Sequence, residues 1–415
     1  MTDLLTVTGD LVIPDAPPNP YGRFRDNPRA WLKNNLFGST INGIVTVIFT
    51  VAFVYIMFRV LKYVFVSGRW DAVQGGLTSL MVGLNYPRDT SSLARVWIAV
   101  GLFAAVGGLA TGAAHRSRAS TWMNSARPWL PVLAIGALLA SLTETLTPKL
   151  LAMAVVPVLV ISAAIGAGLP ERVTRRLWIV YGIGVAVAAF VLTGGALGAK
   201  EEWGGMLLAL YVASFGIVLS FPLGLLLALG RRSRLPVVRS LSVIYIELIR
   251  GVPLITLLFA GDLALRFFLP AGTDPPGKIM RSIIMIVLFS AAYIAEIVRG
   301  GLQGVPRGQL EAAQSLALGP ITTLRKVVLP QALRSVLPAL VGQFISLFKD
   351  TTLLTIIGIR EVIGVAENIT SQREFRNQGY TPELLTFVGL LFWVCCYSMS
   401  KASRRLETRM GVGVR

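Results

Sequence analysis

Charged residues are scarce in this 415-residue chain, at 14% of the total, whereas an ordinary soluble domain has about 25%. Hydrophobic residues make up 54%, and the mean hydropathy is +0.67. The shortage of charge extends along the whole sequence, and apolar runs of about 18 residues or more recur. Such runs are too long for ordinary core helices. The composition therefore excludes a set of soluble domains and predicts an integral membrane protein.

Histidine and cysteine are almost missing. The one histidine, His115, lies in a basic connection, and the two cysteines, Cys395 and Cys396, are adjacent within an apolar segment. Neighbouring cysteines do not easily adopt disulfide geometry, and these three residues are too few for a metal-ligand set. We therefore expect no metal site and no catalytic residue in this chain.

The sequence also lacks a metalloprotease zinc motif and a nucleotide-binding phosphate loop. The sequence has no His-Glu-x-x-His, and its nearest approach to a phosphate-binding loop, residues 194–200, lacks both an adjacent Gly-Lys and the following hydroxyl residue. This excludes ATP binding by the phosphate-loop route. We expect no cofactor in this chain.

Acidic residues are outnumbered, because 39 Lys and Arg face 21 Asp and Glu, giving a net charge of +18. In a soluble protein this excess would suggest a nucleic-acid partner. Here the basic residues lie at the ends of apolar runs, so we expect a lipid bilayer and no nucleic acid. Residues 1–40 contain prolines and then basic residues without a preceding apolar stretch, which predicts a cytosolic tail rather than a signal peptide.

Apolar segments of spanning length recur from residue 41 onwards. About 20 residues cross a bilayer of ~30 Å. The segments are 41–61, 93–114, 129–147, 150–169, 177–197, 205–229, 241–268, 280–298, 336–358 and 383–400. We predict an all-α membrane protein of about ten transmembrane helices. Because the third and fourth segments touch, eight or nine helices stay open as alternatives.

The distribution of basic residues predicts the orientation. With the N-terminus in the cytosol, the cytosolic connections hold about twice as many Lys and Arg as the outer ones. We therefore expect both termini in the cytosol, with a cytosolic basic tail over 403–415. The hydrophilic stretch 300–335 is cytosolic in this arrangement.

That stretch has a helical pattern interrupted by glycine and proline. Pro306 suits a first helical turn, Gly319 suits a left-handed helix end, and Pro320 suits the start of another helix. We expect two short helices joined by a sharp bend. Small Ala312 and Ala313 would allow a partner surface to approach closely, and the Glu311 carboxylate would suit an arginine on that partner.

Residues 307–331 read RGQLEAAQSLALGPITTLRKVVLPQ and resemble the EAA loop of ABC-importer permeases. The upstream stretch AAYIAEIVRGG (291–301) matches the run leading into that loop. YIELIRGVPL (245–254) and KDTTL (349–353) are similar to motifs of the histidine/glutamine type, the latter with Thr for Ser. The resemblance covers about 200–402. The N-terminal half resembles, more loosely, the long permeases of general L-amino-acid transporters.

The resemblance implies an ABC type I importer permease core over 205–402 and an accessory segment of about five helices over 41–200. It implies transport of polar or general L-amino acids, together with an ATPase dimer, a second permease subunit and an extracytoplasmic amino-acid-binding protein. The residues expected to contact the ATPase are Glu311, Ala312, Ala313, Ser315, Leu316, Gly319 and Pro320.

Ionisable residues within the late spans are candidates for the substrate pathway. Charges inside a bilayer are costly unless they are paired or hydrated. Glu247 lies one turn before Arg250 and could pair with it, whereas Lys349 has no acid one turn away. The candidates are Glu247, Arg250, Lys349, Asp350 and Thr351. A structural ion-pair network is the alternative. Gly251 and Pro253 predict either a break or a simple kink in the seventh span.

Two other function classes are weaker. An ion-coupled secondary carrier should show an internal repeat and deep carboxylates in several spans, and the first five spans show few ionisable residues. An intramembrane enzyme would need a nucleophile–base or metal set, which the sequence lacks. An ABC permease for another small polar solute is the nearest alternative.

Overall fold

The computed structural model describes residues 28–87, 89–115, 146–169, 184, 187, 202–270, 272–376 and 378–409. Every regular element in these ranges is a helix, which confirms the predicted all-α fold. The chain divides into two compact units, Met1–Arg69 and Trp70–Arg415, and each is described by itself.

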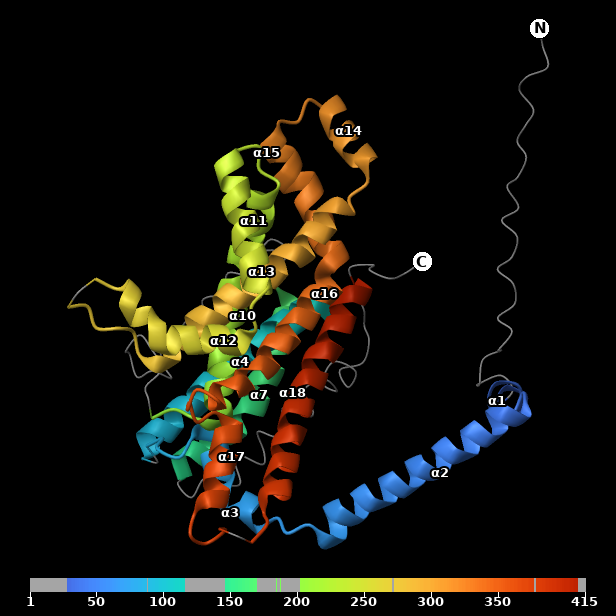
Figure 1. Cartoon of the computed structure of the whole chain (residues 1–415), viewed down its shortest axis with the longest axis vertical. Coiled ribbons are helices and arrows are strands. Elements are labelled where there is room, and N and C mark those ends of the chain that lie inside the picture. Colours follow the sequence, from blue (N-terminus) through green and yellow to red (C-terminus); the bar gives the residue numbers. More distant parts are fainter. Residues whose placement is uncertain are drawn as a thin grey trace. The chain divides into compact units, whose positions relative to one another are not determined.

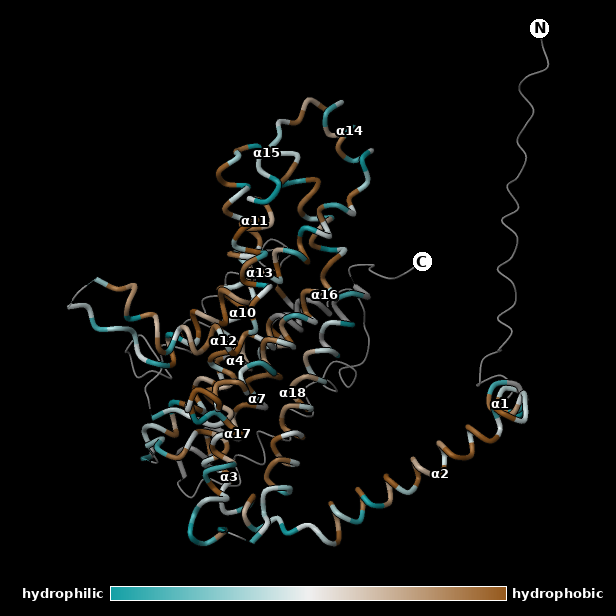
Figure 2. The backbone as a smooth tube through the Cα atoms, viewed as in Figure 1, coloured by the Kyte–Doolittle hydropathy of each residue, from teal (hydrophilic) through white to brown (hydrophobic). Residues whose placement is uncertain are grey.

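The first unit contains α1 (Pro28–Leu36) and the long helix α2 (Thr40–Lys62). Ser39 caps α2, because its side chain accepts a hydrogen bond from the Asn42 backbone N–H at 3.2 Å. Most residues of α2 are hydrophobic (Figure 2), and none of them is buried. The first predicted span, 41–61, is therefore a helix suited to lipid.

The second unit is an assembly of long antiparallel helices with shorter ones at both ends (Figure 1). Its helices are α3 (Asp71–Val82), α4 (Thr90–His115), α7 (Leu146–Gly168), α10 (Gly205–Arg231), α11 (Pro236–Arg250), α12 (Leu254–Phe259), α13 (Lys278–Gln303), α14 (Arg307–Ser315), α15 (Pro320–Thr323), α16 (Leu329–Asp350), α17 (Val362–Ser371) and α18 (Thr381–Arg409).

Six helical stretches in the described part of the chain are long and apolar enough to cross a membrane, or seven if the bent pair α11–α12 counts as one. The predicted spans 129–147 and 177–197 fall almost entirely outside the described residues. The total of about ten therefore stays a prediction.

Small residues bring the central helices into close contact. A Cβ at Gly224 of α10 would lie 2.6 Å from a side-chain carbon of Ile294 on α13. A Cβ at Gly301 would lie 2.6 Å from the Ala332 carbonyl oxygen on α16. Because small residues allow helix backbones to approach, α13 packs tightly between α10 and α16.

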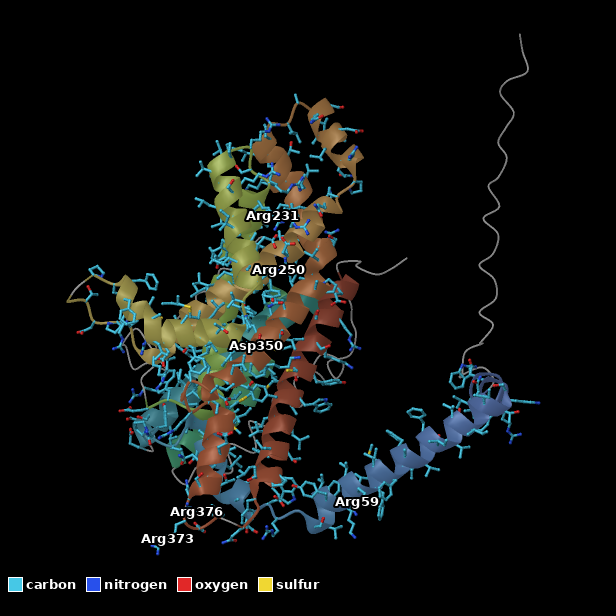
Figure 3. The ribbon with its side chains drawn as sticks, in the orientation of Figure 1. Arg59, Arg231, Arg250, Asp350, Arg373 and Arg376 are labelled. Carbon is cyan, nitrogen blue, oxygen red and sulfur yellow. The ribbon has the colours of Figure 1, made fainter. Side chains whose placement is uncertain are left out.

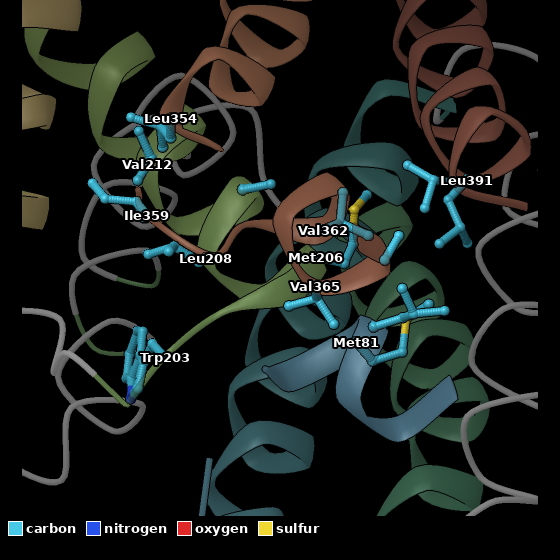
Figure 4. Packing of buried hydrophobic residues seen from close by; sticks show 14 of the residues in the cluster. Met81, Trp203, Met206, Leu208, Val212, Leu354, Ile359, Val362, Val365 and Leu391 are labelled. Carbon is cyan, nitrogen blue, oxygen red and sulfur yellow. The ribbon is translucent and has the colours of Figure 1, made fainter. Parts of the chain in front are cut away.

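The larger core joins an unexpected helix to the helices of the C-terminal half. Residues 62–92 lie between the first two predicted spans, yet residues of α3 within this stretch are buried against α10, α17 and α18 (Figure 4). Gly83 has φ +105°, and the Gly204 N–H donates to the Val82 carbonyl at 3.2 Å. Residues from the N-terminal half thus contribute to the core of the C-terminal half. The proposed division between 41–200 and 205–402 stays a prediction.

Glu361 is a fully buried carboxyl at the start of α17. Its Oε1 accepts from Thr355 Oγ1 at 2.6 Å and from the Ile363 N–H at 2.7 Å, whereas its buried Oε2 has no hydrogen-bond partner among the described residues. Burial raises the pKa of Glu361 to about 7, although these hydrogen bonds oppose the shift. The group lies outside the spanning helices.

This carboxyl predicts a pH-dependent stability. The pKa of Glu361 is higher in the folded state than in the unfolded chain, so its contribution is fully present below about pH 4.5 and is lost as the pH rises through about 7. Between about pH 5 and about pH 8, we expect the free energy of unfolding of the solubilised wild-type protein to fall by on the order of 3 kcal/mol relative to that of Glu361→Gln. Thermal unfolding of both proteins across this range measures the difference, and parallel curves would contradict it.

Candidate functional site: a surface knob and a charge cluster

The bend predicted for the hydrophilic stretch 300–335 is present, and residues 307–323 form what we call the coupling knob. It consists of α14, a turn and α15, and lies at the end of the second unit opposite α3 and α17 (Figure 1). Pro306 immediately precedes α14, and Pro320 is the first residue of α15, as its fixed φ favours. The knob's two-helix architecture is therefore confirmed.

The turn of the knob corrects one detail. Gly319 is extended, with φ −63° and ψ 157°, and Ala317 takes the left-handed conformation instead, with φ 50°. The Ala317 N–H donates to the Gln314 carbonyl at 2.8 Å and the Leu318 N–H donates to the Ala313 carbonyl at 3.0 Å. This is the Schellman arrangement, in which the residue after the helix end is usually glycine.

The strained alanine gives a testable consequence. Ala317→Gly should stabilise the end of α14 by about 1 kcal/mol, because glycine adopts positive φ without a Cβ penalty. Hydrogen exchange of the amides over 307–318 should slow roughly fivefold. Ala312→Gly, at an exposed position inside the same helix, is the matched control and should speed exchange. Unchanged exchange in Ala317→Gly would contradict the strain argument.

The knob presents mixed polar and apolar surface. Ala313 is buried, while Glu311 and Ala312 are exposed. Leu316 and Ile321 are 73% and 80% exposed. The remaining predicted contact residues, Ser315, Gly319 and Pro320, are also exposed. The structure therefore gathers the seven predicted residues on one projection, six of them accessible to a partner. Their contact with an ATPase stays a prediction.

The seventh predicted span is broken rather than kinked. α11 ends at Arg250, and the helical segment resuming at Leu254 runs at 104° to it. The Gly251 N–H still donates to the Glu247 carbonyl at 3.0 Å, after which Pro253 has no N–H to continue the pattern. Arg250, the last residue of α11, lies directly before this bend (Figure 3).

Five ionisable residues meet there in what we call the arginine cluster: Arg231, Glu247, Arg250, Glu296 and Arg299. Glu296 of α13 is central and only 16% exposed. Its carboxylate accepts from Arg231 Nη1 at 2.8 Å and from Arg299 Nη2 at 2.8 Å, and an Nη1 of Arg250 lies 3.6 Å away. Arg231 also donates to Glu247 at 2.9 Å. One carboxylate therefore ties α10, α11 and α13 together.

The local pairing of Glu247 with Arg250, which the sequence allowed, is not the one in the structure. Glu247 binds Arg231 on α10, and Arg250 approaches Glu296 on α13 and lies over the Tyr293 ring, 5.7 Å from its centroid. Packing of the three helices brings these distant charges together. Sequence reasoning also missed Glu296, although a carboxylate near the end of an apolar span was a visible signal.

The second group of candidates lies elsewhere, at the end of α16. Thr351 is buried, and its hydroxyl donates to the Phe348 carbonyl at 2.7 Å. Lys349 is exposed and has no ion pair within 4 Å in the described part of the chain, and Asp350 is half-buried. The structure thus brings Glu247 and Arg250 into one cluster but leaves Lys349, Asp350 and Thr351 outside it. No group of His, Cys, Asp and Glu residues suited to a metal occurs among the residues described.

Comparisons with known proteins agree with this architecture. Residues 220–412 match the family described as binding-protein-dependent transport system inner membrane component. The chain is 33% identical over 449 residues to the glutamate/glutamine/aspartate/asparagine transport system permease protein BztC of Rhodobacter capsulatus, and the alignment covers 99% of each protein. It is 48% identical over 213 residues to the inner membrane amino-acid ABC transporter permease protein YhdY of Escherichia coli, covering 51% of this chain and 57% of that protein.

One solved structure with similarity is an amino acid ABC transporter with histidines. It is 30% identical, covers 49% of this chain and 91% of that chain, and has a TM-score of 0.44.

Proposed function

We propose that this chain, which belongs to the family of binding-protein-dependent inner-membrane permeases of amino-acid ABC transporters, passes polar L-amino acids through the cytoplasmic membrane while a separate subunit hydrolyses ATP. The observation that carries the proposal is the coupling knob, a compact exposed projection at the end of the helices that hold the arginine cluster. ATP–Mg belongs to the partner ATPase in this proposal.

The chain is a multi-pass inner-membrane protein, and the proposal adds its partners and orientation. We propose that both termini and the coupling knob face the cytosol, where two ATPase subunits bind the knobs of two permease chains. An extracytoplasmic amino-acid-binding protein would deliver substrate at the opposite face. The name of BztC lists glutamate, glutamine, aspartate and asparagine, which supports an amino-acid substrate for this chain.

Purification of the intact complex tests the proposal. The expected result is co-purification of an ATPase and a second permease subunit, and ATP-dependent uptake of glutamine, glutamate or related amino acids into proteoliposomes. Uptake that follows an ion gradient and needs no ATP would instead identify a secondary carrier.

Lys349 provides a residue-level prediction about the pathway. Because Lys349 is exposed and has no acidic partner within 4 Å among the described residues, Lys349→Met should leave thermal stability within about 0.5 kcal/mol. If Lys349 lies on the substrate pathway, uptake should fall at least about tenfold. Lys401→Met, which removes an exposed lysine from α18, is the control and should retain uptake. Unchanged uptake in Lys349→Met would remove this residue from the pathway.

A further inference from the structure

The arginine cluster carries an excess positive charge. Three guanidinium groups share two carboxylates, those of Glu247 and Glu296, in the described part of the chain. The side chains of the cluster are 16% to 55% exposed, so the third guanidinium is reachable from solvent. A carboxylate that enters the cluster would give it a charged partner.

Arg250 is the cation with the weakest attachment. Arg231 and Arg299 donate hydrogen bonds of 2.8 Å to Glu296, whereas Arg250 approaches it only to 3.6 Å, beyond hydrogen-bond distance. Its side chain is 36% exposed, and the guanidinium group has five N–H donors. Arg250 therefore has donors available for a second carboxylate in the fork geometry that arginine favours.

The position of Arg250 directs these donors away from the apolar side of α11. The exposed apolar stripe of that helix consists of Val237, Leu241, Ile244 and Leu248. At about 100° per residue, Arg250 falls on the side of α11 opposite this stripe, directly before the 104° break. Glu247 lies one turn away, and its side chain is 55% exposed.

We propose that the arginine cluster binds the α-carboxylate and α-ammonium groups of the transported amino acid at the broken end of α11. Arg250 contacts the carboxylate, and the exposed oxygen of Glu247 receives the ammonium group. Glu296 is a positioning residue, because it holds Arg250 through charge and fixes α11 against α13. The inference rests on the proposed function. The cluster would recognise the carboxylate and ammonium groups that all α-amino acids share. It would therefore not discriminate among amino acids by their side chains.

Equilibrium dialysis of labelled L-glutamine against the purified permease–ATPase complex, without the binding protein, tests this site. Arg250→Gln should weaken binding at least about tenfold, because the carboxylate loses its charged partner. Arg239→Gln removes a positive charge from the same helix, at a position without an ion pair within 4 Å among the described residues, and should bind as wild type does. Unlabelled L-asparagine should compete, whereas glutamine methyl ester should not.

Wild-type affinity in Arg250→Gln, or equal competition by the ester, would overturn the proposal. If Arg250→Gln fails to assemble, Arg250→Lys keeps the charge and removes the fork. Weaker binding at wild-type thermal stability is then expected, and unchanged binding would reject the site. The failure of this site and the failure of the proposed function give different results. A wild-type complex that takes up no amino acid with ATP refutes transport. Normal wild-type uptake together with unaffected binding in the Arg250 variant refutes only this site.

Discussion

Glu296→Gln is expected to destabilise the solubilised permease complex by about 3 kcal/mol. The carboxylate is 16% exposed and neutralises arginines from three helices, with hydrogen bonds from Arg231 and Arg299. Removing its charge leaves three cations near one remaining carboxylate, that of Glu247. The cost is that of uncompensated partly buried charge rather than of one lost contact.

The measurement is thermal or denaturant unfolding of the complex, with membrane insertion checked separately. Glu247→Gln is the matched control, since this residue makes one hydrogen bond, to Arg231, and its side chain is 55% exposed. Its effect should be below about 1 kcal/mol, as for exposed ion pairs. Equal effects of the two substitutions would show that Glu296 is not the centre of the network.

Local sequence signals predicted the two helices of the coupling knob and an interruption at Gly251 and Pro253, although they left open whether that interruption is a break or a kink. Gly251 and Pro253 interrupt α11–α12 because proline lacks an N–H, and Pro320 starts α15 because its φ is already helical. These features depend on residues within one or two turns. The sequence predicts the left-handed residue at Gly319, whereas in the structure it is Ala317. The hydrogen bonds that end α14 decide this position, and not the location of the residue that best tolerates positive φ.

Tertiary features were harder to predict. The partner of Arg250 is Glu296, far along the chain, and it is selected by the packing of α11 on α13 rather than by helical spacing. The buried helix α3 was also missed, because a 12-residue apolar helix is too short to be recognised as a span. Its burial comes from contacts with α10, α17 and α18, which one sequence does not reveal.

The second large effect is expected at the coupling knob, where Glu311 is the only acidic residue between 299 and 335. It is exposed on α14, in a stretch that also contains Arg307, Arg325 and Lys326. A lysine or arginine of the partner placed opposite Glu311 would form an ion pair with the one carboxylate in this otherwise basic stretch. Reversal of that one charge should therefore oppose docking more than any other surface change in the knob.

Glu311→Lys should weaken association with the ATPase about 100-fold and abolish ATP-driven uptake, because juxtaposed like charges at a contact cost several kcal/mol. Insertion and thermal stability should stay at wild-type values, since the side chain is exposed. Gln314→Lys places a lysine one turn along α14 and is the control, although it changes the charge by +1 (from 0 to +1) where Glu311→Lys changes it by +2 (from −1 to +1). A smaller effect there identifies a specific contact at Glu311, whereas equal effects identify general repulsion. Normal assembly and uptake in Glu311→Lys would exclude this carboxylate from the coupling contact.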